Sequence, residues 1–289
     1  MIMYILYRLG CILACTLPIK ASYYLACRIA DMQYTIGTEE RKAVIKNLQV
    51  VMRSDALPAR EIDRMARDVF RNFAKYLVDF FRFSKIDDDY IKRFVKVEGL
   101  ENIEAARKER KGVIILSAHM GNWELGGIVV PSLGYKLSAV VLTHKNKRIN
   151  DFFTRQRVGG NLTPIEIGPS LRSCYTVLKE NMFLALLGDR DFMNNGVKVK
   201  FFGQEASIPK GPAFFAHRIG SPMVPAFMIR EKDDTFRLVF EKPIFPDCRQ
   251  DKDKAIKDMT GQYLSILERY IRNFPTQWYA FREVWSNNI

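Results

Sequence analysis

The sequence is poor in the residues from which metal sites and disulfide frameworks are built. Its 289 residues include only three histidines and five cysteines; Cys11 and Cys15 lie in the apolar N-terminal segment, and the other three cysteines have no metal spacing. These counts argue against a His-rich metal centre. Scattered cysteines are typical of free thiols in a reducing compartment.

Signatures of several common enzyme classes are also missing. The chain has no Gly-x-Ser-x-Gly nucleophile turn, no His-Glu-x-x-His metal helix and no Gly-x-x-x-x-Gly-Lys phosphate loop. Acidic residues are the scarcer charged type, at 32 against 45 Lys and Arg, which gives a net charge of +13. Because this excess is spread along the chain without a basic tail, we expect an anionic membrane surface or an acidic protein as partner, and no nucleic acid.

No apolar run reaches the length of about 20 residues that a membrane-spanning helix needs. The segment 1–18 is apolar but short, and Arg8 in its middle also argues against a secretory signal peptide. Together with 19–29 it could form a helical hairpin on a membrane surface, with its turn near Pro18, or an ordinary buried helix. We therefore expect a membrane-associated N-terminal helical segment over 1–30 and one folded domain over 31–289.

The remaining chain alternates between strand and helix patterns. Apolar residues at helical spacing predict an amphipathic helix over 61–83, whose basic face is either solvated or a dock for lipid phosphates or an acidic carrier protein. Apolar runs predict strands at 92–97, 113–117, 137–142, 164–167, 182–187, 197–202, 223–230 and 235–241. Helices are predicted at 101–109, 124–130, 150–158, 171–180, 211–219 and 253–273. The expected fold class is α/β, a mixed, mostly parallel sheet flanked by helices, with an N-terminal apolar helical segment.

His119 and Glu124 are the main candidates for catalysis. They follow the predicted strand 113–117, and Gly121 and Asn122 interrupt the pattern before the next helix. Carboxyl ends of strands are where α/β folds place their ligands. If the chain turns between the two residues, a carboxylate beside the imidazole lets His119 take a proton from a hydroxyl. A buried histidine with a satisfied hydrogen bond is the alternative.

A second charged cluster follows the predicted strand 182–187. Asp189 and Arg190 are followed by Asp191, an arrangement suited to an Arg that meets a phosphate or a thioester carbonyl, or to a structural ion pair. Gly211 and Pro212 open a helix whose free N–H groups suit an anion, and Lys210 adds a positive charge; an ordinary helix start with a surface Lys is the alternative. His144, in a basic loop after another strand, is a further candidate for contact with a phosphate, whereas His217 is expected to be a core or surface histidine.

The order of these motifs resembles the bacterial lipid A biosynthesis lauroyl/myristoyl acyltransferase family, within the lysophospholipid acyltransferase superfamily. The resemblance runs from about Leu17 onward. It is carried by the His119-to-Glu124 motif and by the segments 41–48, 186–191, 199–203, 210–213, 224–226 and 275–279. Arg157 also matches a family position.

The resemblance implies transfer of a fatty acyl chain from an acyl thioester, on acyl carrier protein or coenzyme A, to a hydroxyl of an anionic glycolipid such as a lipid A precursor. His119, held by Glu124, would be the general base. Asn122, or main-chain N–H groups near Gly121, would face the oxyanion. No metal or redox cofactor is implied, and the expected location is the cytoplasmic face of a bacterial inner membrane. The alternatives are a lysophospholipid or other lipid acceptor and, in a different class, a catalytically silent membrane-binding protein.

Overall fold

A seven-stranded sheet forms the centre of the computed structural model, which describes residues 2–53, 57–166, 170–192 and 195–285. Its strands lie in the order β1-β9-β8-β2-β5-β3-β4, and β6 and β7 pair separately. The pairs in the large sheet are parallel except for β8 and β9. The strands are β1 (Val95–Glu98), β2 (Val113–Ser117), β3 (Leu137–Val141), β4 (Thr163–Glu166), β5 (Phe183–Leu187), β6 (Val197–Phe201), β7 (Gln204–Ile208), β8 (Met223–Arg230) and β9 (Phe236–Phe240).

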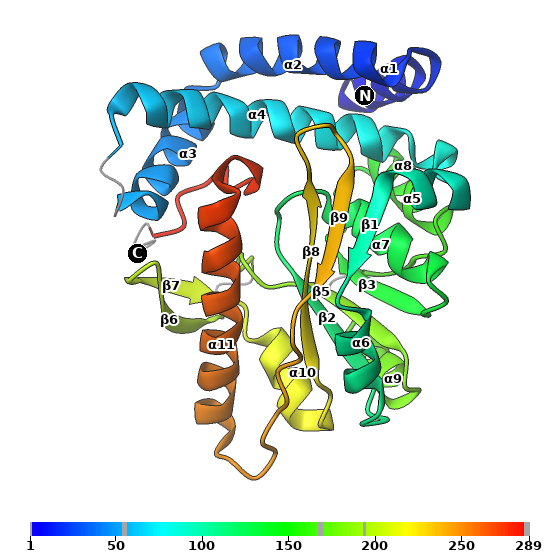
Figure 1. Cartoon of the computed structure of the whole chain (residues 1–289), viewed down its shortest axis with the longest axis vertical. Coiled ribbons are helices and arrows are strands. Elements are labelled where there is room, and N and C mark those ends of the chain that lie inside the picture. The colour runs from blue at the N-terminus through cyan, green and yellow to red at the C-terminus, as the bar shows by residue number, and fades with distance from the viewer. Residues whose placement is uncertain (1, 54–56, 167–169, 193–194, 286–289) are drawn as a thin grey trace.

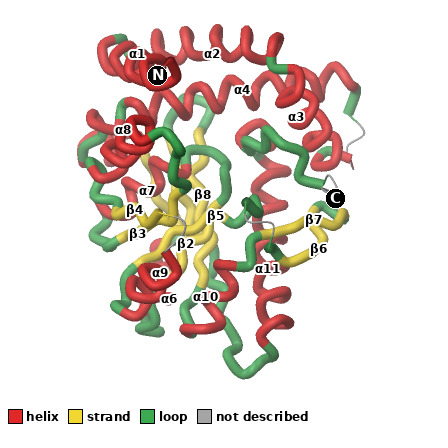
Figure 2. The backbone as a smooth tube through the Cα atoms, turned by 180° about the vertical axis from the view of Figure 1, so that it is seen from behind, coloured by secondary structure: helices red, strands yellow, loops and turns green. Residues whose placement is uncertain are grey.

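Helices cover both faces of this sheet, and the strands run through the middle of the molecule (Figure 2). The helices are α1 (Ile2–Thr16), α2 (Ile19–Ile36), α3 (Thr38–Val51), α4 (Ala59–Phe81), α5 (Asp88–Phe94), α6 (Leu100–Arg107), α7 (Trp123–Ser132), α8 (Lys147–Val158), α9 (Ser170–Lys179), α10 (Gly211–Ile219) and α11 (Lys252–Asn273). Short 3₁₀ turns occupy Phe83–Lys85 and Pro275–Gln277. The mixed, mostly parallel sheet flanked by helices is therefore confirmed.

Alternation of side chains along the strands divides the core between the two faces. Ile114 and Leu116 of β2 belong to a cluster that includes residues of α10 and α11, whereas Val113 and Ile115 pack with residues of α7. Successive strand residues point to opposite faces, so an unbroken apolar run is needed where both faces are covered. That requirement explains why β2 and β5 read as continuous apolar runs in the sequence.

At 92–94 and 204–208 the type of element differs from the sequence prediction. Residues 92–94, expected to begin a strand, end helix α5, whose first turn is capped by the Asp87 side chain, which accepts a hydrogen bond from the Tyr90 N–H. Strand β7 was not predicted; it pairs antiparallel with β6 through a tight turn at Phe202 and Gly203, both with positive φ.

The N-terminal helices form a layer against α4 (Figure 1). The chain turns at Leu17 and Pro18, as expected, and α2 packs along α4 with Tyr23 and Tyr34 buried between them. Helix α1 also packs on α8, where Tyr7 contacts Phe152 and Phe153. Among the described residues, no helix combines the length and the apolar character needed to cross a bilayer. The domain boundary predicted at residue 30 falls inside α2.

Candidate active site

A sharp turn after β2 places the His119 motif at the carboxyl end of that strand. Gly121 has φ +58°, and a Cβ atom there would lie 1.9 Å from the carbonyl oxygen of Met228. Only glycine fits this position. The side-chain oxygen of Asn122 then accepts a hydrogen bond of 3.1 Å from the Leu125 N–H and caps α7. The sequence therefore changes from strand to helix within five residues, and His119 lies in the turn.

Asp189 is the acid that contacts His119. Its Oδ1 lies 2.8 Å from His119 Nδ1 and also accepts the main-chain N–H of His119 at 3.1 Å. Strands β2 and β5 are parallel neighbours with Ser117 beside Leu187, so residues two positions beyond each strand meet. The indole N–H of Trp278 donates to the other oxygen of Asp189, Oδ2, at 3.2 Å. Trp278 is a site residue that sequence reasoning missed.

The surroundings keep Asp189 ionised. Burial of this fully buried side chain would by itself raise its pKa, but the charge and hydrogen bonds of His119, together with the Arg190 guanidinium, hold the pKa well below its usual range. A carboxylate bound to Nδ1–H leaves Nε2 of His119 as the nitrogen that can accept a proton. The pair therefore has the geometry that a general base and an orienting acid need.

The C-terminal segment holds this turn from the other side. The Gly121 N–H donates to the Gln277 carbonyl at 2.9 Å, and the Tyr279 N–H donates to the His119 carbonyl at 2.9 Å. Met120 and Trp278 thus face each other in an antiparallel bridge. The segment 275–279 was part of the family resemblance, but nothing in its sequence indicated that it would support His119.

Glu124 lies elsewhere than expected. Its carboxylate is paired with the guanidinium of Arg157 on α8, at 2.5 Å from Nη2 and 3.0 Å from Nε, and both side chains are about nine-tenths buried. Burial alone would lower the pKa of Arg157, but the charge of Glu124 raises it. Among the described residues, no hydrogen bond or ion pair joins His119 to Glu124. The expected contact between them is therefore corrected: the first turn of α7 directs Glu124 to α8.

His119, Glu124 and Arg157 nevertheless line one cavity of about 220 Å³. The cavity lies between one face of the sheet and α7. Ile115 of β2 and Ala185 of β5, which are side by side in register, both line it, together with residues of α7. Its walls are mostly apolar, and a few polar side chains lie among the lining residues. Further lining residues are Gly126, Gly127, Val130, Leu137, Ala139, Leu162, Ala226, Met228 and Leu238, with His144 and Trp123. Such a cavity suits a ligand with an apolar body and one reactive polar end.

The other predicted site residues are distributed more widely. Arg190 lies beside Asp189, with Nε 3.8 Å from Oδ2, and donates to the Tyr279 carbonyl. Asn122 is fully buried behind the turn, and its amide N–H donates to Asp79. The main-chain N–H groups of Gly121 and Asn122 donate to Gln277 and Met228. The oxyanion donors expected at Gly121 and Asn122 are thus engaged in structural hydrogen bonds.

Lys210 and Gly211 begin α10, as expected, but do not line the cavity. His144 does line it, although no role was assigned to it beyond contact with a phosphate, and burial and the nearby Arg157 lower its pKa. His217 is half-buried, with Nε2 3.2 Å from the Gln250 carbonyl oxygen. Among the described residues, no group of three or more His, Cys, Asp or Glu side chains could hold a metal ion.

Comparison with known proteins assigns the chain to a family. The model of the bacterial lipid A biosynthesis acyltransferase family matches residues 1–287. The chain belongs to this family. It is therefore an acyltransferase, and the motif order that suggested the resemblance is confirmed. The histidine, the neighbouring acid and the apolar cavity described above are features that this chemistry can use.

Individual relatives are distant. A lipid A biosynthesis palmitoleoyltransferase of Escherichia coli is 25% identical over 264 residues, which cover 91% of this chain and 84% of the relative. A lipid A biosynthesis lauroyltransferase of the same organism is 23% identical over 271 residues, with the same coverage. A phosphatidylinositol mannoside acyltransferase of Mycolicibacterium smegmatis is 23% identical over 239 residues, 80% of this chain and 76% of the relative.

Proposed function

We propose that the protein transfers a fatty acyl chain from a thioester, on acyl carrier protein or coenzyme A, to a hydroxyl of an anionic glycolipid, for which a lipid A precursor is the first choice. The observation that carries this proposal is the contact of the buried carboxylate of Asp189 with His119, which lines a mostly apolar cavity. The names of the relatives support a glycolipid acceptor, since two act in lipid A biosynthesis and one on a phosphatidylinositol mannoside.

In this reaction Nε2 of His119 takes the proton of the acceptor hydroxyl as its oxygen attacks the thioester carbon. The new carbon–oxygen bond forms, and the carbonyl oxygen becomes an oxyanion. Collapse of this intermediate breaks the carbon–sulfur bond, and the imidazolium returns its proton to the leaving thiolate. Asp189 holds Nδ1–H and stabilises the imidazolium between these steps.

Arg190 is the candidate for stabilising the oxyanion or the phosphate of a substrate. It lies next to Asp189 and keeps a positive charge near the dyad. The pKa of Arg190 is lowered by burial, although the charge of Asp189 opposes the shift. A partly desolvated guanidinium binds anions more strongly than one in water, because the local dielectric constant is lower.

The cavity accommodates the acyl chain. Ala139, Ala185 and Ala226 lie on the sheet side of the cavity, and Gly126 and Gly127 lie on α7. Small side chains on both walls leave room for methylene groups. The Glu124–Arg157 pair lies in the same wall and joins α7 to α8, so it holds the two helices that frame the cavity.

The N-terminal helices provide the surface that meets the membrane. Large apolar side chains remain exposed on α1 and α2: Met3, Ile5, Leu6, Leu9, Ile12, Leu13, Tyr24, Leu25, Ile29, Met32 and Ile36. An exposed apolar surface of this size is typical of an interaction site. Exposed Arg8, Lys20 and Arg28 on the same helices suit anionic lipid headgroups. We therefore propose that α1 and α2 lie on the cytoplasmic face of a bacterial inner membrane.

The test is transfer of a radiolabelled acyl chain from acyl carrier protein, and separately from coenzyme A, to three acceptors: a lipid A precursor, a phosphatidylinositol mannoside and a lysophospholipid. Label in the lipid A precursor supports the full proposal. Label only in another acceptor keeps the chemistry and replaces the acceptor. His217→Ala serves as the matched control, because this histidine contacts the Gln250 carbonyl and does not line the cavity.

A further inference from the structure

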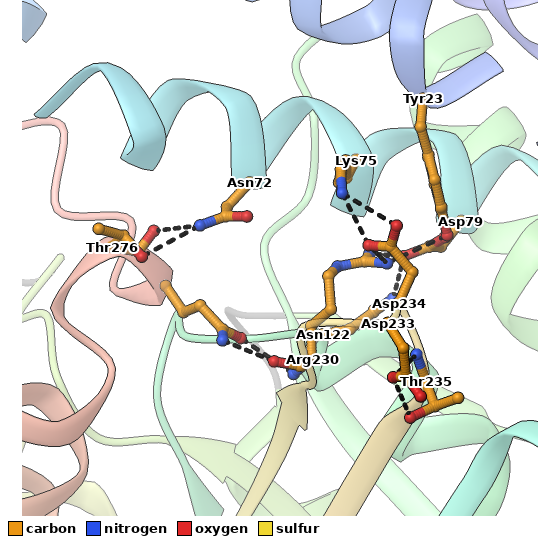
Figure 3. A network of polar contacts seen from close by, with 11 residues as sticks. Tyr23, Asn72, Lys75, Asp79, Asn122, Arg230, Asp233, Asp234, Thr235 and Thr276 are labelled. Carbon is orange, nitrogen blue, oxygen red and sulfur yellow. Dashed lines mark hydrogen bonds and ion pairs between the residues drawn. The ribbon is translucent and has the colours of Figure 1, made fainter. Parts of the chain in front are cut away.

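A buried polar network lies behind the catalytic turn and reaches the N-terminal helices (Figure 3). At its centre the carboxylate of Asp79, on α4, accepts hydrogen bonds from three side chains on three other segments. Tyr23 of α2 donates its hydroxyl to Oδ1, and Asn122 donates its amide N–H to Oδ2 at 2.8 Å. Arg230, at the end of β8, donates to the same Oδ2. All four side chains are more than nine-tenths buried.

The charges of this network are balanced. Arg230 pairs with Asp79 and, more loosely, with Asp234, which in turn accepts two hydrogen bonds from Lys75. Arg230 also donates to the hydroxyl oxygen of Tyr23 at 3.1 Å. Buried polar groups that are all paired hold one geometry, since each alternative arrangement leaves a group without a partner. The network is therefore suited to holding one of its side chains in a fixed place.

Asn122 is the position that the network fixes. Its amide N–H meets Asp79, its side-chain oxygen caps α7, and its main-chain N–H donates to Met228 at 2.8 Å. It lies between His119 and Glu124 in the turn. A displacement of Asn122 would therefore move the backbone that carries His119 relative to Asp189.

A second tyrosine makes the same kind of bond without this connection. Tyr34, also on α2 and also buried, donates its hydroxyl to the carboxylate of Asp63 on α4 at 2.6 Å. The same two helices are thus joined by two Tyr–Asp hydrogen bonds. Among the described residues, no hydrogen bond or ion pair leads from Asp63 to the catalytic turn, whereas Asp79 contacts Asn122 directly.

We propose that Tyr23 is a positioning residue for the acyl-transfer reaction, acting through Asp79 on Asn122 and hence on the turn that carries His119. The N-terminal helical pair is then part of the support of the active site as well as a membrane contact. This inference rests on the proposed function, because it requires His119 to act in the transfer.

The experiment compares Tyr23→Phe with Tyr34→Phe, each of which removes one buried hydroxyl that donates to a carboxylate on α4. We expect Tyr23→Phe to lower kcat by about tenfold, less than the roughly hundredfold loss that a misplacement of one ångström can cause. KM for donor and acceptor should stay near the wild-type value. Tyr34→Phe should leave kcat unchanged although it also lowers the unfolding temperature, so a loss of stability alone does not account for the effect of Tyr23→Phe.

A double-mutant cycle tests the route. Asn122→Ser keeps a side-chain oxygen to cap α7 but is too short to reach Asp79, and it should lower kcat by a similar factor. Adding Tyr23→Phe to Asn122→Ser should then lower kcat no further, because residues that act through one contact are not additive. Additive losses would overturn the proposal.

Equal kcat values for the two Phe variants would also overturn it, and an Asn122→Ser enzyme with wild-type kcat would do so even if Tyr23→Phe failed to fold. His119→Ala separates this inference from the proposed function. An active His119→Ala enzyme removes the proposed mechanism, whereas an inactive one with indistinguishable Phe variants removes only the role of Tyr23.

Discussion

Substitution of Asp189 by Asn is the perturbation whose effect follows most directly from the geometry. Three N–H groups converge on this carboxylate: Nδ1–H and the main-chain N–H of His119, and the indole N–H of Trp278. An Asn side chain offers one oxygen in place of two. If that oxygen faces His119, the new NH₂ group points at the indole N–H, and one donor loses its acceptor.

The size of the effect can be worked out from the charges. When His119 takes a proton, its new positive charge lies about 4 Å from the Asp189 carboxylate. At an effective dielectric constant of about 20 the attraction between them is about 4 kcal/mol. Loss of this stabilisation in the transition state corresponds to a fall in kcat of about a thousandfold. Little screening by solvent is expected, because the Asp189 side chain is fully buried.

The assay is single-turnover acyl transfer with wild type, Asp189→Asn and Asp191→Asn. Asp191 is the matched control, since it lies two residues further on and accepts hydrogen bonds from the Gly196 N–H and the Ser207 hydroxyl. The Asp191→Asn enzyme should keep a single-turnover rate close to wild type. A folded Asp189→Asn enzyme within about fivefold of wild type would refute the reasoning, because the worked attraction corresponds to a far larger loss.

Three further predictions follow from the cavity, the N-terminal helices and the titration of Asp189. Ala185→Phe should narrow the cavity and shift selectivity toward shorter acyl chains, with about a fourfold loss of kcat/KM for each methylene that no longer fits. If the dependence of kcat/KM on acyl-chain length is unchanged across a series of acyl thioesters, the cavity is not the acyl site. Leu9→Glu combined with Ile29→Glu should release the protein from anionic vesicles in a flotation assay. Gln33→Glu, at an exposed position on α2, should not release it. Equal binding by wild type, the double variant and Gln33→Glu would exclude the α1–α2 surface as the membrane contact. The pKa of Asp189 is lowered in the folded state, so its contribution to stability is present above the ordinary carboxyl range and is lost as pH falls below about 4. In urea unfolding from pH 5 down to pH 2, the free energy of unfolding should therefore fall less steeply for Asp189→Asn than for wild type. Equal slopes for the two proteins would contradict this assignment.

Local patterns in the sequence were enough to predict most of the fold. Continuous apolar runs at β2 and β5 indicated strands with both faces covered, and the core confirms this. The start of α5 escaped prediction because it depends on a single side chain, that of Asp87, which caps the helix. Such capping depends on backbone geometry that periodicity does not reveal.

The partner of His119 was not predictable in the same way. Glu124 is five residues away and Asp189 is seventy, and spacing along the chain favours the near acid. The contact with Asp189 arises because β2 and β5 are parallel neighbours in register, which depends on the order of strands in the sheet. Trp278 and Asn122 illustrate the same limit, since their roles follow from segments that are brought together only by the fold.

The central claim is that His119 is the general base of the acyl transfer. It is tested most directly by mixing excess enzyme with a radiolabelled acyl thioester and the acceptor lipid, and following a single turnover with wild type, His119→Ala and His217→Ala. The account predicts rapid transfer with wild type and His217→Ala, and no transfer above the uncatalysed rate with folded His119→Ala. Transfer by His119→Ala at a rate comparable to wild type would contradict it.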